Sequence, residues 1–406
     1  MKERTELTME LNFHAKRSIG SIELRDSPLQ SHFNARYVNM APHHRNDTHE
    51  LIKGLKSSLW ALVPMAEWQP EMAPTVEQAA SYISQYVTTR RALFVDGGSC
   101  LEAVKAARRG GATVISQDDV LDAVDWKRLL PILNLDERPR GRAGQGLNVL
   151  AGHISLIALG LAANDIVFQC DADVRNYREL APLERLIGAW WDQKGIHHVK
   201  LSQPGRNNES LMIVRTLQRL WNALDLDWIP ESVKDLGEDI FMALGPDKWL
   251  TCGIYLSRGQ VVQARPGATG YLDATLQALW TINAPECGWR KVRHVEAEPP
   301  CQDVQNSPTK EFTVLTNIST FIHTVALLGK PPHSWNLAEI EALNTRIMPQ
   351  LDHVPIVSGE GRPVSVHHIN TERIIPSPGY LITRDLLDLD RVRKVAMRAI
   401  EDGCLK

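Results

Sequence analysis

Asp165–Val174 reads DIVFQCDADV, and this stretch decides the fold. Its apolar segment, residues 165–170, is short and bounded by polar residues, which predicts a strand buried on both faces. A helix rich in Leu, Ile, Ala and Gly is expected directly before it, over Leu147–Ala163. A helix that leads into a fully apolar strand is typical of a parallel sheet with helices on its faces. The stretch therefore predicts an α/β fold.

The same alternation extends towards the N-terminus. Strands are expected over Ser58–Pro64, Arg91–Asp96 and Ala112–Ser116, and helices over Thr75–Val87 and from Ser99, as the cap, to Arg108. From residue 306 the pattern changes to helices, a loop punctuated by Pro and Gly, and a charged helix. We expect a mostly parallel sheet flanked by helices in residues 1–305, and a mainly helical C-terminal subdomain in residues 306–406.

Composition excludes several classes of protein. The 406 residues include 45 Lys and Arg against 48 Asp and Glu, a formal net charge of -3. A nucleic-acid-binding protein needs a basic surplus, so this class is not expected. The longest apolar stretch, Ile154–Phe168, contains polar residues and is too short for a membrane span. No secretion signal is visible and the six cysteines are widely spaced, which predicts a cytoplasmic protein with reduced thiols.

Polar residues follow three of the expected strands, at the point where each strand ends. They are Pro64–Glu67, Asp96–Ser99 and Asp171–Asp173. In open α/β sheets, ligands bind beyond the carboxyl ends of the strands. Two aspartates separated by one residue can share Mg²⁺ or Mn²⁺ and leave other positions for water and phosphate oxygens. The alternative is that Asp171 and Asp173 only cap the following turn.

Two further segments suit a ligand. Arg138–Gly146, RPRGRAGQG, combines three arginines with three glycines ahead of the apolar helix, an arrangement that favours phosphate. It matches neither the dinucleotide-binding pattern nor a P-loop, and a solvated basic loop is the alternative. In ALFVDGGS, Asp96 is placed to accept hydrogen bonds from a base or ribose, or only to organise the turn. The second glycine of a nucleophile elbow is missing there, which argues against a serine hydrolase.

Several segments, in their order along the chain, resemble the GT-A type nucleotide-sugar glycosyltransferases. They are similar in particular to the mannosyl-3-phosphoglycerate and glucosyl-3-phosphoglycerate synthases. The segments are RSIGSIEL, LWALVPMAE, LFVDGGS, GGATVIS, GRAGQG, DIVFQCDADVRNY, HHVK, LGED, GYLD and VRHVEAEPPCQD. The resemblance spans roughly residues 15–305 and is strongest at DADVRNY. It implies a Rossmann-like GT-A fold and a metal-dependent hexose transfer that retains the anomeric configuration.

The resemblance also implies roles for individual residues. For the metal, Mg²⁺ or Mn²⁺, it implies Asp173 as a ligand, with Asp303 or His294 as a further one. For the donor it implies Pro64, Glu67, Asp96, Gly97, Arg140, Arg142, Asp171 and Ala172. For catalysis it implies Glu238 and Asp273, which face the transferred sugar or the acceptor. For an anionic acceptor such as 3-phosphoglycerate, the candidates are Lys200 and Arg206.

The sequence departs from the family where a metal-binding histidine is expected. This chain has Pro299–Asp303, PPCQD, in that place. This departure suggests a catalytically inactive relative that binds the nucleotide sugar, beside two other interpretations: transfer to 3-phosphoglycerate or a similar acceptor, and transfer by the same fold to another small acceptor. A sugar-phosphate nucleotidyltransferase, a further rival, would need a glycine-rich loop with Arg after the first strand, where this chain has MAEWQPEM. The expected partners are a nucleoside-diphosphate sugar and a small anionic acceptor, and the apolar C-terminal helices also suit a homodimer.

Overall fold

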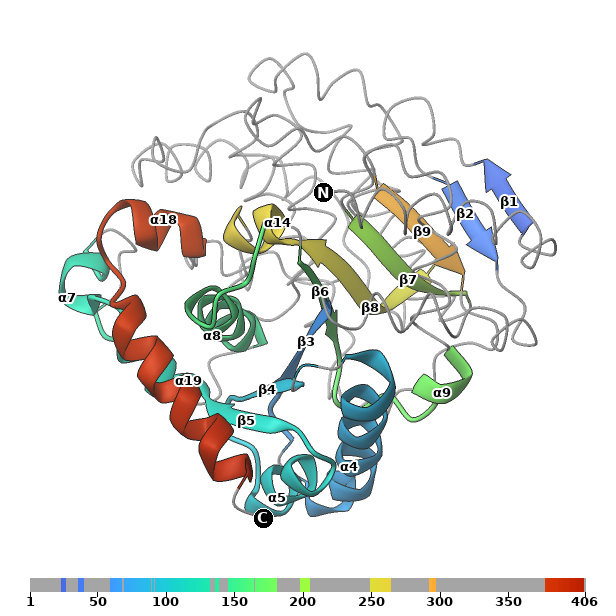
Figure 1. The fold of residues 1–406 in the computed structure, drawn as a ribbon, viewed down its shortest axis with the longest axis horizontal. Coiled ribbons are helices and arrows are strands. Elements are labelled where there is room, and N and C mark those ends of the chain that lie inside the picture. The colour runs from blue at the N-terminus through green and yellow to red at the C-terminus, as the bar shows by residue number, and fades with distance from the viewer. Residues whose placement is uncertain are drawn as a thin grey trace, which may run out of the picture.

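The computed structural model describes the chain in separate stretches. These are residues 23–26, 36–39, 59–67, 69–88, 90, 92–131, 136–138, 145–163, 165–180, 198–204, 249–263, 292–296 and 377–404. Within them, nine strands form one sheet in the order β1-β2-β9-β7-β8-β6-β3-β4-β5 (Figure 1). The strands are β1 Glu23–Asp26, β2 Arg36–Asn39, β3 Leu59–Met65, β4 Leu93–Asp96, β5 Thr113–Ser116, β6 Ile166–Cys170, β7 His198–Pro204, β8 Trp249–Ser257 and β9 Val292–Glu296.

The sheet is mostly parallel. Strands β6, β3, β4 and β5 are parallel neighbours, as are β7 and β9, and β9 and β2. Strand β8 runs antiparallel to both β6 and β7, and β1 runs antiparallel to β2. Because β8 reverses direction between β6 and β7, these two strands run the same way. The predicted α/β fold with a mostly parallel sheet is confirmed.

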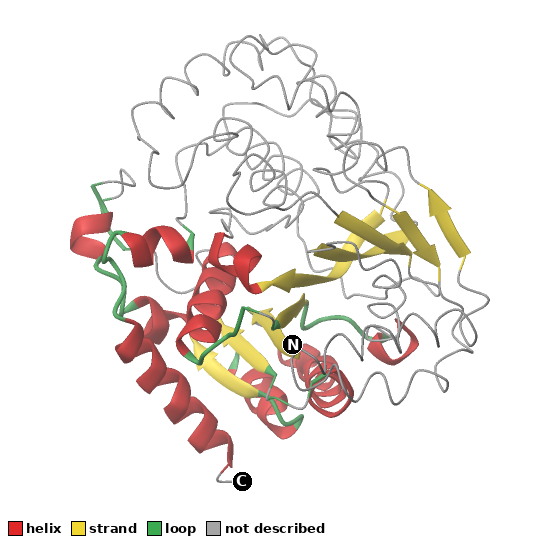
Figure 2. Ribbon diagram, turned by 45° about the horizontal axis from the view of Figure 1, so that its top comes forward, coloured by secondary structure: helices red, strands yellow, loops and turns green. Residues whose placement is uncertain are grey.

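Helices cover both faces of the β3–β4–β5 part of the sheet (Figures 1 and 2). Helices α8 and α19 lie on one face, and α4 and α5 lie on the other. The described helices are η3 Pro70–Met72, α4 Ala73–Tyr82, η4 Ile83–Val87, α5 Leu101–Arg109, α6 Gln117–Leu121, α7 Trp126–Leu129, α8 Gln145–Ala158, α9 Tyr177–Leu180, α14 Arg258–Gln263, α18 Pro378–Thr383 and α19 Leu389–Cys404. None of them is long and apolar enough to cross a bilayer.

Two helix boundaries differ from the sequence prediction. Helix α8 ends at Ala158 and not at residue 163, because Gly160 adopts a φ of 93° that a continuing helix does not allow. The expected helix 75–87 is α4 followed by one wide turn, η4, in which Thr88 N–H bonds to Ile83 O. The residues at which these helices end therefore depend on local backbone geometry, which the spacing of apolar residues does not encode.

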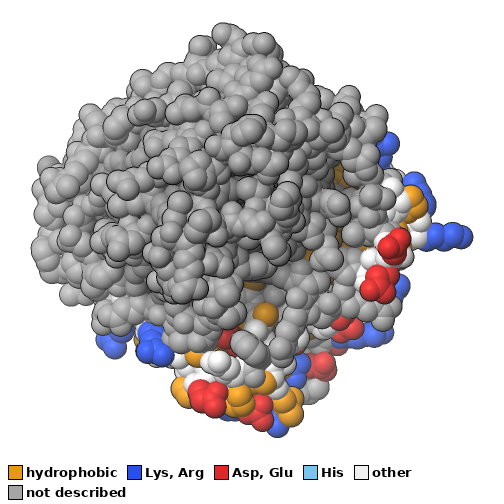
Figure 3. All heavy atoms as spheres, turned by 180° about the vertical axis from the view of Figure 1, so that it is seen from behind, with side chains coloured by type: hydrophobic (Ala, Val, Ile, Leu, Met, Phe, Trp, Pro, Cys, Tyr) orange, Lys and Arg blue, Asp and Glu red, His pale blue; other side chains and the backbone are white. Residues whose placement is uncertain are grey.

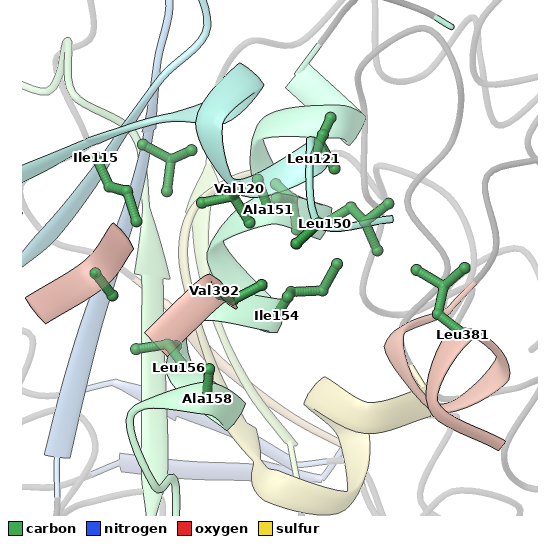
Figure 4. Packing of buried hydrophobic residues seen from close by; sticks show 14 of the residues in the cluster. Ile115, Val120, Leu121, Leu150, Ala151, Ile154, Leu156, Ala158, Leu381 and Val392 are labelled. Atoms are coloured by element: carbon green, nitrogen blue, oxygen red, sulfur yellow. The ribbon is translucent and has the colours of Figure 1, made fainter. Parts of the chain in front are cut away.

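The hydrophobic core of the described residues lies between β3, α8 and α19. Every residue of β3 and β6 is buried. Figure 4 shows side chains of α8, among them Leu150, Ala151 and Ile154, packed with residues of β5, α6 and α19. At Gly152, a Cβ would lie 2.3 Å from the Leu62 side chain, so glycine allows α8 to approach β3 closely. This packing fixes the start of α8 against the ends of the strands.

The segment 377–404 belongs to the same core. Helix α19 packs on β5, α6 and α8, and Val392 and Ala396 are fully buried. Upstream of α19, Leu386 O accepts from Asp125 N at 2.8 Å, and Asp388 N donates to Ala123 O at 2.9 Å. The expected charged helix is confirmed, and it contacts the sheet of the first 305 residues. The rest of the expected C-terminal subdomain, residues 306–376, lies outside the described residues.

Candidate functional site

The carboxyl ends of β3, β4 and β6 lie at one edge of the sheet. Met65, the last residue of β3, pairs with Asp96, the last residue of β4. Strand β3 also pairs with β6, with Leu62 opposite Gln169, so Asp171 leaves the sheet beside the end of β3. Three of the polar segments singled out in the sequence are thus neighbours in space. We call this group, formed by Glu67, Asp96, Asp171 and Asp173, the carboxylate edge.

The backbone of Glu67 is held by the turn that follows β4. Its N–H donates to Ser99 Oγ at 2.9 Å, and its carbonyl accepts from Cys100 N at 2.7 Å. The prediction that Ser99 caps a helix is wrong, because α5 begins at Leu101 and Cys100, its N-cap residue, provides no side-chain bond. The hydroxyl of Ser99 instead joins the end of β3 to the end of β4. Glu67 is therefore fixed at both of its backbone groups.

The side chain of Glu67 carries the main electrostatic anomaly of the site. Its pKa is raised from 4.5 to about 7, first by burial and second by the negative charge of Asp173. Burial and a like charge both disfavour the ionised carboxylate. Carboxylates whose pKa is perturbed by burial and a like charge are concentrated at functional sites. The structure thus brings Glu67 and Asp173 together from β3 and β6.

The turn after β6 alternates between buried and accessible residues. Asp171 and Asp173 are partly exposed, whereas Ala172 and Val174 are only 2% and 1% exposed. The apolar pair anchors the turn in the core and leaves the two carboxylates at the edge of the sheet. Tyr177, the first residue of α9, donates from its hydroxyl to Asp171 O at 2.5 Å. The turn is thus held by side chains between and after the two aspartates.

Asp96 organises the turn after β4. Its Oδ1 accepts from Gly98 N at 3.1 Å and from Ser99 N at 2.7 Å. This is the turn-forming role that the sequence left open, and a contact between Asp96 and a donor stays a prediction. The N–H of Gly97 donates to Met65 O at 2.8 Å, so Gly97 also ties β4 to β3.

Asn148 lies beneath this turn. Its Nδ2 donates to Met65 O at 3.2 Å, and a Cβ on Gly97 would lie 2.3 Å from its Oδ1. The side chain of Asn148 is 2% exposed, and its Oδ1 has no hydrogen-bond partner in the described structure. Asn148 therefore connects the start of α8 with the ends of β3 and β4.

A second buried polar pair joins α8 to β6. His153 Nε2 lies 3.1 Å from Gln169 Oε1, two residues before Asp171. Burial lowers the pKa of His153 to about 4, against a smaller effect of the bond to Gln169. The imidazole is therefore neutral at pH 7, and its Nε2 donates to the Gln169 carbonyl oxygen. His153 and Asn148 are polar positions on an otherwise apolar helix, and that interruption of the apolar pattern is the signal by which the sequence could have revealed them.

Arg138 is committed to structural contacts at the start of the arginine-rich segment. It forms ion pairs with Asp118 and Asp122, and its guanidinium carbon lies 6.0 Å from the centroid of the Trp126 ring. Arg391 of α19 also lies 3.7 Å from Asp122. The two arginines that the resemblance assigns to the donor, Arg140 and Arg142, lie outside the described residues.

The remaining predicted residues are placed only in part. Lys200 in β7 pairs with His294 in β9 and with Ile254 in β8, which in turn pairs with Gln169 in β6. The backbones of Lys200 and His294 thus share one row of the sheet with Gln169. Pro64 lies buried in β3. Arg206, Glu238, Asp273 and Asp303 lie outside the described residues.

The carboxylate edge has the chemistry of a divalent cation site. Carboxylate oxygens are the ligands that Mg²⁺ and Mn²⁺ prefer, and Mg²⁺ is commonly held by one or two carboxylates together with substrate phosphates. No cluster of three or more His, Cys, Asp or Glu that could hold a metal occurs within the described stretches. The pair Glu67 and Asp173 fits a cation that takes its other ligands from a nucleotide or from water.

Figure 3, which shows the molecule from behind the view of Figure 1, has Lys and Arg side chains interspersed with Asp and Glu on its described part. Between α4 and α5, Arg109 Nη2 lies 2.6 Å from Glu77 Oε2 in an exposed ion pair. Exposed pairs of this kind contribute little to stability. The carboxylate edge differs from this surface, because Glu67 and Asp173 bring two like charges together.

The comparisons with known proteins give a likeness of structure and not of sequence. No family model matches the chain, and no curated protein matches it. A structure of glucosyl-3-phosphoglycerate synthase from Mycobacterium tuberculosis with phosphoglyceric acid is 17% identical, with a TM-score of 0.47 over 72% of this chain and 85% of that chain. Another, with Mn²⁺, uridine diphosphate and phosphoglyceric acid, is 18% identical, with a TM-score of 0.46 over 70% of this chain and 82% of that chain. At these identities the likeness concerns the fold alone.

Proposed function

We propose that the protein is a metal-dependent glycosyltransferase that moves a hexose from a nucleoside-diphosphate sugar to a small anionic acceptor such as 3-phosphoglycerate, with retention of configuration. The observation that supports this most is the raised pKa of Glu67 beside Asp173 at the carboxyl ends of β3 and β6. A nucleotide bound at that edge follows the general placement of ligands in α/β sheets. The resemblance of DADVRNY to the glycosyltransferase family supports the same assignment.

Each carboxylate then has a separate task. Asp173 and Glu67 hold Mg²⁺ or Mn²⁺, which when bound stabilises the charge that develops on the diphosphate leaving group. Asp171 holds the ribose or the water shell of the cation. Asp96 and Gly97, at the turn after β4, contact the nucleoside, while Pro64 and Ala172 shape the walls of the donor site. Glu67, which the resemblance assigns to the nucleoside, is assigned here to the cation because the charge of Asp173 acts on it.

Positive side chains complement these groups. Arg140 and Arg142 bind the diphosphate, and Lys200 and Arg206 bind the anionic acceptor. Forked guanidinium donors match phosphate oxygens. Glu238 and Asp273 orient the transferred sugar and the acceptor hydroxyl. In retaining transfer of this type a donor phosphate oxygen receives the proton of the acceptor, and no separate base is required.

The test is a transfer assay with a panel of donors. UDP-, GDP- and ADP-sugars are each incubated with 3-phosphoglycerate or with other small hydroxy acids, in Mn²⁺, in Mg²⁺ and in chelator. We expect product with one donor base, only when a divalent cation is present. Product that forms equally well in chelator would contradict the metal-dependent mechanism.

Two outcomes distinguish the alternatives. Transfer to a different small hydroxy acid, with none to 3-phosphoglycerate, would identify a transferase of the same fold with another acceptor. Cation-dependent binding of a nucleoside diphosphate without turnover would identify an inactive relative, an outcome suggested by the Pro299–Asp303 departure. A protein that binds no nucleoside diphosphate with either cation would contradict all three interpretations.

A further inference from the structure

The turn that carries Asp171 and Asp173 follows the last residue of β6. The last residue of β6, Cys170, pairs with Gly253 of β8, and Asp171 lies beyond this ladder. The backbone carbonyl of Asp171 accepts instead from the hydroxyl of Tyr177, six residues further along the chain. The hydroxyl of Tyr177 thus adds a side-chain contact that holds the turn.

Tyr177 is itself rigidly held. Its side chain is 2% exposed and is among the largest fully buried ones in the described structure. Its ring stacks on Tyr82 of α4, with centroids 6.3 Å apart and planes inclined by 9°. It also meets Phe168 of β6 edge to face, with centroids 6.5 Å apart and an angle of 81°. Offset-stacked and edge-to-face contacts are the preferred aromatic geometries, so α4 and β6 together fix where the hydroxyl lies.

The hydroxyl and the two buried residues of the turn act on the same backbone. Ala172 and Val174 anchor the turn in the core, and Tyr177 holds the carbonyl of Asp171. These three contacts restrict the backbone of the turn, so the Cα–Cβ bond of Asp173 keeps one direction relative to Glu67. A ligand group that is pre-oriented in this way loses less freedom when a cation binds.

We propose that Tyr177 is a positioning residue that orients Asp173 for the divalent cation through its bond to the carbonyl of Asp171. The inference rests on the proposed function, because it assumes that Asp173 binds a cation. Tyr177 touches neither cation nor donor in this arrangement. Removing its hydroxyl therefore weakens cation binding while the buried ring and the fold are retained.

The test measures Mn²⁺ binding to Y177F in the presence of UDP, GDP or ADP. Binding is monitored by electron paramagnetic resonance, as the loss of the signal of free Mn²⁺. We expect the half-saturating Mn²⁺ concentration to rise about tenfold, the lower end of the effects typical of residues that orient a metal ligand. The matched control is Y82F, which removes a hydroxyl from the adjacent ring of the same stack and should leave Mn²⁺ binding unchanged. Both variants are measured at a temperature at which thermal unfolding shows them fully folded.

A double variant separates positioning from general damage. In the D173A background, Y177F should cause no further loss of Mn²⁺ binding, because the ligand that it orients is gone. Y177F that binds Mn²⁺ as tightly as wild-type protein, or a loss that is just as large in Y82F, would overturn the inference and leave the proposed function intact. Wild-type protein that binds no Mn²⁺ with any of the three nucleotides would overturn both.

Discussion

The carboxylates at the two edges of the sheet have different surroundings. At the amino edge, Asp165 precedes β6 and is 6% exposed. It accepts from Trp60 Nε1 at 2.8 Å and from Ala162 N at 2.9 Å, and Arg90 lies 3.6 Å away. The same guanidinium lies 4.2 Å from the centroid of the Trp60 ring. The carboxylate of Asp165 therefore has two hydrogen-bond donors and one guanidinium around it.

At the carboxylate edge, two carboxylates face each other. Burial first, and the negative charge of Asp173 second, raise the pKa of Glu67 to about 7. Removing one member of a buried cluster of charged and polar groups is strongly destabilising, because the groups that remain lose their partner. Carboxylates with a perturbed pKa are concentrated at functional sites. The difference predicts that removal of a carboxylate decreases stability at the amino edge and ligand binding at the carboxylate edge.

The largest effect is expected for D173A. Loss of this carboxylate should lower kcat/KM for hexose transfer about 1,000-fold, the upper range for removing one group that stabilises transition-state charge. Folding should not suffer, because the repulsion of Glu67 is relieved. The transfer assay and urea unfolding measure the two effects, and D402A, at an exposed position in α19, is the control. A D173A protein as active as the control would contradict the assignment of the carboxylate edge.

The reverse is expected at the amino edge. D165A leaves the indole N–H of Trp60 and the N–H of Ala162 without their acceptor, and should lower the free energy of unfolding by about 3 kcal/mol. Urea unfolding measures the loss, and Mn²⁺-dependent nucleotide binding of the folded fraction should persist. A D165A protein that keeps the stability of the wild type but loses nucleotide binding would contradict the proposed difference between the two edges.

His153 lies between the edges and makes stability depend on pH. Its pKa is about 4 in the folded protein and about 6.5 when unfolded, so the unfolded chain binds the proton more tightly. Its contribution is therefore complete above pH 6.5 and is lost as the pH falls towards 4. Between pH 7 and 5 the loss should be about 2 kcal/mol. Urea unfolding of the wild type and of H153Q at both pH values isolates the loss of stability that is due to His153. An equal pH dependence of the free energy of unfolding in both proteins would show that His153 does not cause the loss.

The smallest effect is expected for G97A. The added Cβ would overlap Asn148, and the forced shift should cost about 1 kcal/mol. In G97A/N148A the second change makes room, so the double variant should lose less stability than the sum of the single variants. Thermal unfolding of the four proteins measures the coupling. Purely additive losses would mean that Gly97 and Asn148 do not limit the approach of α8 to the strand ends.

The sequence predicts the fold more fully than the site. Strands β3–β6 and helices α4, α5, α8 and α19 follow from apolar runs and helical spacing, because burial on one or both faces leaves a periodic pattern. The placement of Glu67 beside Asp173 follows from the rule that parallel strands end at one edge. The proximity of Glu67 and Asp173 is therefore the feature of the site that follows from the order and direction of the strands.

The contacts that hold the site in shape could not be predicted in this way. Ser99 supports Glu67 and not a helix, and the hydroxyl of Tyr177 reaches the carbonyl of Asp171. Asn148 reaches back to the end of β3, 83 residues earlier in the chain. Each of these bonds depends on how two elements pack against each other, and a tyrosine, serine or asparagine has no periodic signature that reveals its partner. The support of the site is a tertiary property.

The position of α19 on β5 has a consequence for how the chain folds. Arg128 donates to the carbonyl of Asp385, a contact between residues 257 positions apart in the chain. Contacts of such long range slow folding, and domains are synthesised from the N-terminus at a limited rate. The apolar surface of β5, α6 and α8 therefore stays uncovered while the ribosome makes the intervening residues. Residues 389–404 cover this surface once they are made, so the packing of β5, α6 and α8 is completed only late in synthesis.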